Sequence, residues 1–106
     1  MEELEIIIVD CGKNTKGENM YFARCPQMDI RVGMDGASPE CVEKELIMIM
    51  KANSNSLLKD ESRLREELKS LLPYARHIIE SGENFKFKKT FVLYNPSNEP
   101  YGDLSY

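Results

Sequence analysis

The chain has 106 residues, of which 42% are hydrophobic and 30% are charged, and its formal net charge at pH 7 is −4. This length suits one domain, 1–106, and the composition excludes a disordered chain. No apolar run approaches the roughly 18 residues of a membrane span, and the start MEELE is acidic where a signal peptide is basic. We therefore expect a cytoplasmic protein without membrane contact. The negative charge also argues against direct nucleic-acid binding, because phosphates require Lys and Arg.

Three β-strands are predicted in the first third of the chain by residues that alternate between apolar and polar. The run LEIIIVDC predicts a strand near 4–11 that is covered on both faces for part of its length. The runs MYFARC and MDIRVGM predict strands near 20–25 and 28–34. Pro26 separates these two strands, because proline offers no N–H to the ladder. Together the three segments predict an antiparallel meander.

Two helices are predicted after the meander. Ser38 as the N-cap and Pro39 at the first helical position mark the start of a helix near 38–52. The polar run NSNS then predicts a loop. Apolar residues at helical spacing predict a second helix near 60–81, which Pro73 should kink or split.

The end of the chain predicts one more strand. The segment FKFKKTFVLY indicates a strand near 85–94, so residues 53–94 comprise a helical segment and a fourth strand. Residues 95–106 predict an irregular tail. The predicted fold class is α+β: an antiparallel sheet in a β-β-β-α-α-β chain, with the helices packed on one face.

The segments YFARCPQMDIRV and GASPECVEKEL follow each other closely and form a recognisable pattern. A strand ends in Pro, a polar-apolar-Asp-apolar segment leads into the next strand, and a Gly-x-Ser-Pro-Glu helix start follows. This pattern resembles the HicB-like antitoxin family over about residues 4–52. The matching positions are Tyr21, Ala23, Pro26, Asp29, Ile30, Gly36, Ser38, Pro39, Glu40, Val42 and Leu46.

The resemblance implies a reduced RNase H-like β-β-β-α-β unit without nuclease activity. It also implies a protein-binding function, in which the module neutralises a small partner, such as an mRNA-cleaving toxin, by covering its surface. One alternative is a small metal-dependent nuclease of RNase H-like descent that uses Asp10. A magnesium-dependent cleavage assay with an Asp10→Asn control separates the two hypotheses. The sequence favours the binding protein, because two-metal hydrolysis needs several converging carboxylates.

The potentially reactive side chains do not form a catalytic or metal-binding pattern. Asp10 lies in the segment VDCGKNTKG, which is typical of a β-hairpin loop. The nearest other acidic residues are Asp29, expected at an exposed strand position, and Asp35, expected in a turn. The three cysteines lack Cys-x-x-Cys spacing. We expect each of them to pack as a small hydrophobic residue: Cys11, Cys25 and Cys41. His77 is expected to lie on the flank of the second helix. We therefore expect no catalytic residue, metal or cofactor.

The run LIMIM gives the first helix a wider apolar surface than packing on one sheet requires. The final strand offers a sheet edge that another chain could join, because only its lysines disfavour such pairing. These features favour a homodimer over a monomer, or contact with a partner protein. The candidate interface residues are Ile47, Met48, Met50, Phe87 and Phe91.

Overall fold

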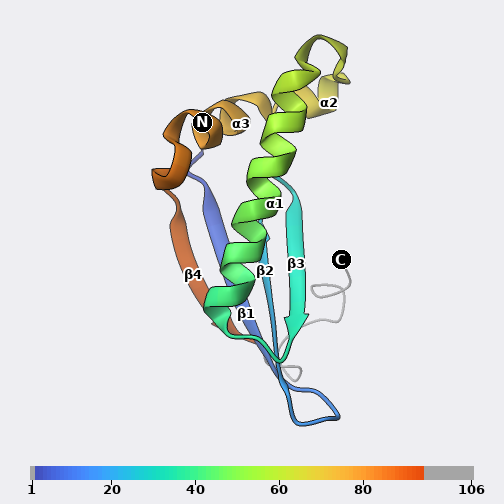
Figure 1. Ribbon diagram of the computed structural model, residues 1–106, viewed down its shortest axis with the longest axis vertical. Coiled ribbons are helices and arrows are strands. Elements are labelled where there is room, and N and C mark those ends of the chain that lie inside the picture. The colour runs from blue at the N-terminus through green and yellow to red at the C-terminus, as the bar shows by residue number, and fades with distance from the viewer. Residues whose placement is uncertain (1, 95–106) are drawn as a thin grey trace.

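Three strands and a long helix occupy the first part of the chain, and a fourth strand follows near its end (Figure 1). The structure is a computed structural model that describes residues 2–94. The main elements are β1 (Glu5–Lys13), β2 (Asn19–Cys25), β3 (Ile30–Asp35), α1 (Pro39–Lys59), α2 (Glu66–Lys69), α3 (Leu72–Ser81) and β4 (Lys88–Leu93). Short 3-10 turns lie at Glu61–Arg63 and Gly82–Asn84. The predicted α+β class is confirmed, whereas the tail predicted over 95–106 lies outside the described residues.

The four strands form one mixed sheet in the order β3-β2-β1-β4. β2 is antiparallel to both β1 and β3, as predicted. β4 is parallel to β1, so the prediction of a wholly antiparallel sheet is wrong for this pair. The helical segment returns the chain to the end of the sheet where β1 begins, and a crossover of this kind produces parallel neighbours. The Lys88 N–H donates to the Leu4 carbonyl at 2.8 Å where the pairing starts.

Helix α1 begins where the sequence predicts and ends later. The Ser38 side chain accepts a hydrogen bond from the Cys41 N–H at 3.2 Å, which confirms the N-cap. The helix then continues to Lys59, so the predicted loop at NSNS is wrong. Ser54 is fully buried, and its hydroxyl donates to the Met50 carbonyl at 2.7 Å. This polar side chain is satisfied inside the helix, and the helix is therefore not interrupted.

The second predicted helix is divided in two, as Pro73 suggested. α2 and α3 are separate, and Pro73 lies in the first turn of α3, where a proline does not break the hydrogen-bond ladder. Gly82 ends α3 with φ at 61°, a conformation that favours glycine. Ala75 and Ile78 are fully buried. α3 packs against α1 at the end of the sheet where β1 begins (Figure 1).

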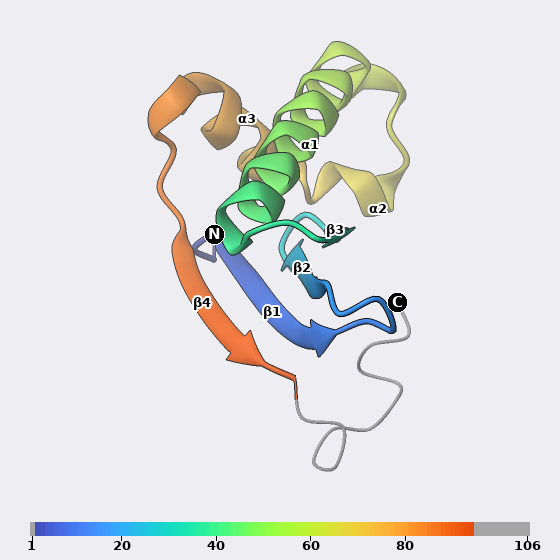
Figure 2. The ribbon, with the colours of Figure 1, turned by 60° about the horizontal axis from the view of Figure 1, so that its bottom comes forward.

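The core lies between the helices and one face of the sheet (Figure 2). Its central residues come from alternating positions of the strands and from one stripe of α1. The largest fully buried side chains are Ile6, Leu46, Met50, Ile78, Val42, Cys25 and Ser54. Within residues 2–94, no helix is long and apolar enough to span a membrane.

Candidate functional site

Asp10 lies in β1, where it pairs with Tyr21 just before the irregularity in the β1–β2 pairing. One carboxylate oxygen of Asp10 accepts a hydrogen bond from the Gly12 N–H at 2.8 Å. Gly12 itself has φ at 83°, which favours glycine. The pairing of the two strands confirms the predicted hairpin. In this position the carboxylate satisfies a backbone N–H where the ladder is irregular.

The carboxylates that could accompany Asp10 do not converge on it. Asp10 pairs with Tyr21, which pairs with Met34 on the helix-covered face. Asp35 follows Met34 and therefore points to the opposite face. Asp29 lies in the turn before β3, at the other end of the sheet. Across residues 2–94, no group of three or more His, Cys, Asp or Glu side chains could hold a metal ion.

The three cysteines occupy different environments. Cys25 is buried in the core, and burial raises the pKa of its thiol. Cys11 is half-buried at the hairpin end of β1, and its pKa is raised by burial and by the charge of Asp10. Cys41 is exposed on α1, so the prediction of a small hydrophobic residue is wrong at this position. His77 lies on α3, at the end of the sheet away from the hairpin (Figure 1).

Cys41 is expected to react with alkylating reagents faster than Cys11 and Cys25. A hydrogen bond from Ser38 lowers the pKa of Cys41, which increases its thiolate fraction near neutral pH. The alkylation rate of Cys41 should rise with pH and reach its plateau at a lower pH than the rate of an unperturbed cysteine does. Ser38→Ala should move this pH profile of the rate to higher pH. Mass spectrometry of timed iodoacetamide reactions measures the order. Faster labelling of Cys25 in the folded protein would contradict the prediction.

The candidate interface residues from the sequence divide into buried and exposed groups. Met50 is fully buried, because it shares the core-facing stripe of α1 with Leu46, and it offers no surface to a partner. Ile47 and Phe87 are half-buried and pack against the core. Met48 and Phe91 remain accessible, with 64% and 53% of their surface exposed. The apolar excess of α1 is therefore smaller than its sequence predicts.

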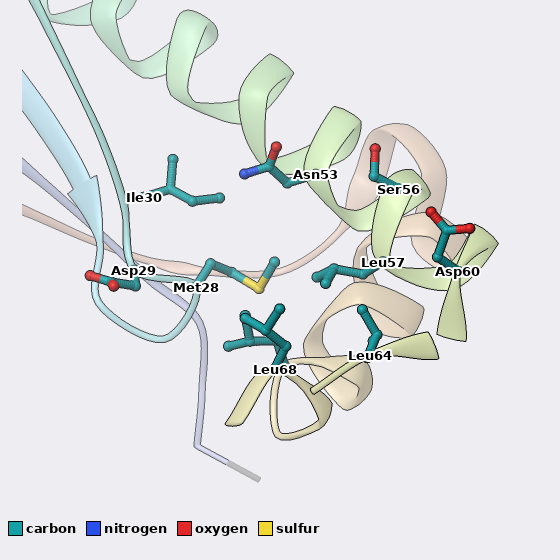
Figure 3. A pocket seen from close by; sticks show the side chains of 10 residues that line it. Met28, Asp29, Ile30, Asn53, Ser56, Leu57, Asp60, Leu64 and Leu68 are labelled. Atoms are coloured by element: carbon teal, nitrogen blue, oxygen red, sulfur yellow. The ribbon is translucent and has the colours of Figure 1, made fainter. Parts of the chain in front are cut away.

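A hollow lies where the C-terminal half of α1, the segment around α2 and the turn before β3 meet (Figure 3). It is an open pocket of about 440 Å³. Its apolar lining residues are Met28, Ile30, Leu57, Leu64, Leu68 and Leu71. Its polar lining residues are Asp29, Asn53, Ser56 and Asp60. We call this hollow the leucine pocket.

The side chains of the leucine pocket separate into an apolar centre and a polar rim. Met28, Leu57 and Leu68 point toward one another across the centre (Figure 3). Asp29 and Asp60 lie on opposite sides of the pocket, and both are exposed. Leu68 keeps 38% of its surface exposed although it is a leucine on a short helix. This arrangement suits an apolar group.

Sequence patterns missed most of the leucine pocket. The spacing of Leu64, Leu68 and Leu71 predicts one continuous stripe against the core, but the break before α3 turns this segment away from it. Leu57 follows the run NSNS, which predicts a loop. The available signal was its spacing, because Leu57 continues the series that places Met50 and Ser54 on the buried stripe.

No family model, curated protein or solved structure matches this chain.

Proposed function

We propose that this protein is a non-enzymatic binding module of the HicB-like antitoxin type. It acts in the cytoplasm by covering part of the surface of a small partner protein, such as an mRNA-cleaving toxin. The observation that carries the proposal is the leucine pocket, with Asp29 and Asp60 at its edges. Burying an apolar side chain of a partner in such a pocket is favourable by roughly 1.5–3 kcal/mol.

The charge of the molecule favours a basic partner. Asp29 and Asp60 flank the apolar centre, and the whole chain carries a net charge of −4. Opposite charges speed association and exclude acidic competitors. A protein that cleaves mRNA must bind phosphates with Lys and Arg, so its active surface complements an acidic one. The HicB-like sequence pattern, which runs from Tyr21 to Leu46, supports the same class of partner.

The partner is expected to be the product of a gene adjacent to the gene of this protein. That product should be short and basic, should stop growth when expressed alone by cleaving mRNA, and should be harmless when both proteins are expressed. Purified together, the two should form a complex of fixed stoichiometry in which RNA cleavage is abolished. A neighbouring product that neither binds this protein nor loses its activity in its presence would contradict the proposal.

A further inference from the structure

Strand β3 forms one edge of the sheet. Among the described residues, it pairs on one side only, with β2 (Figure 1). Arg31, Gly33 and Asp35 are all exposed along it. An open sheet edge is a template for pairing with another strand.

The hydrogen-bond register shows which residues of β3 turn their backbone groups outward. The carbonyls of Leu4 and Asp10 accept from N–H groups of the β4 segment, so even-numbered residues of β1 face β4 and odd-numbered residues face β2. Odd-numbered β1 residues pair with even-numbered β2 residues, which leaves the odd-numbered residues of β2 facing β3. These in turn pair with even-numbered residues of β3. The odd-numbered residues Arg31, Gly33 and Asp35 therefore turn their N–H and C=O groups toward the open edge.

We propose that β3 pairs with β3 of a second copy of this chain, antiparallel, about a two-fold axis at Gly33. In this register Arg31 lies opposite Asp35 of the second copy, and Gly33 lies opposite Gly33. The residues whose backbone groups point across the interface, Arg31, Gly33 and Asp35, then pair with one another, odd-numbered with odd-numbered. Each of these pairs can therefore exchange backbone hydrogen bonds, as an antiparallel ladder requires.

Charge selects this register over its neighbours. Arg31 and Asp35 lie on the same face of the strand, so the two-fold axis at Gly33 creates two opposite-charge pairs. Centring the axis on Arg31 or on Asp35 would place like charges opposite each other. Centring it on Val32 or Met34 would leave both charge pairs unformed. A shift by one residue would set outward-facing backbone groups against inward-facing ones and reverse the faces.

The other face of the strand fits the same arrangement. Val32 and Met34 are half-buried and pack against the core beneath α1. Across the axis, Val32 of each copy lies opposite Met34 of the other, so their remaining apolar surface becomes covered. The result is a continuous eight-stranded sheet in which the helices of both copies lie on the same side.

A charge-exchange experiment tests the register. Light scattering of the purified full chain should give twice the monomer mass of 12.2 kDa. Arg31→Glu and Asp35→Lys should each give the monomer mass, because each variant sets like charges opposite each other. An equimolar mixture of the two variants should return to twice the monomer mass, since glutamate at 31 then faces lysine at 35 in both pairs. Lys44→Glu, which makes the same charge change at an exposed position of α1, should stay dimeric.

Circular dichroism of each variant checks that the fold is kept, and amide exchange of Gly33 gives a second measurement. The Gly33 N–H should be protected in the dimer and should exchange rapidly in the two monomeric variants. A wild-type mass of 12.2 kDa at micromolar concentration would overturn the proposal. Single variants that remain dimeric would also overturn it, because the interface would then lie elsewhere. Failure of the mixture to associate, with both variants folded, would show that the register is wrong.

Discussion

Replacing Leu46 with alanine is expected to lower the free energy of unfolding by about 2–5 kcal/mol. Leu46 has none of its surface exposed and lies on the stripe of α1 that covers the sheet. The substitution removes packed atoms and leaves a cavity that the surrounding core fills only in part. Because small domains are stable by only about 5–15 kcal/mol, this loss is a large fraction of the total.

The matched control is Met48→Ala, two positions along the same apolar run. Met48 is 64% exposed, so its removal should change the free energy of unfolding by no more than about 0.5 kcal/mol. Urea unfolding followed by circular dichroism measures both variants. Equal losses of unfolding free energy in the two variants would mean that α1 does not turn Leu46 toward the core and Met48 toward solvent.

Leu68→Asp is expected to weaken binding of the partner protein by about 30-fold or more, which corresponds to about 2 kcal/mol. Leu68 faces the centre of the leucine pocket, and a carboxylate there would be desolvated by an apolar group of the partner. The same substitution should destabilise the unbound protein less than Leu46→Ala does, because 38% of the Leu68 surface is already exposed and none of the Leu46 surface is.

Phe91→Asp provides the control for the leucine pocket. Phe91 is 53% exposed on β4, at the other edge of the sheet from β3, and is one of the candidate interface residues that the sequence predicts. We expect its affinity for the partner to match that of the wild type in isothermal titration calorimetry. A larger loss for Phe91→Asp than for Leu68→Asp would move the contact surface from the pocket to β4.

Local signals in the sequence predicted most of the elements of this fold. Alternation of apolar and polar residues predicted the strands, and Ser38 and Gly82 marked the start of α1 and the end of α3. The direction of β4 could not be predicted in this way, because alternation is the same in a parallel and an antiparallel strand. It depends on the path of the helical segment, which returns the chain to the start of β1.

The candidate site was harder to predict than the fold. Serine and asparagine are typical of loops, yet Ser54 lies buried inside α1 with its hydroxyl bonded to the backbone. The continuation of α1 brings Leu57 beside Leu64 and Leu68, residues whose spacing alone indicates an ordinary core stripe. A pocket formed where three segments meet depends on their arrangement in space. The spacing of apolar residues within any one segment does not predict it.

The most direct test of the binding account is to follow the leucine methyl signals of this protein by NMR while the product of the adjacent gene is added. The account predicts that the signals of Leu57, Leu64 and Leu68 shift and saturate at a fixed ratio of the two proteins, as RNA cleavage is lost. Shifts confined to Leu93 on β4, or no shift at a ratio that abolishes cleavage, would contradict it.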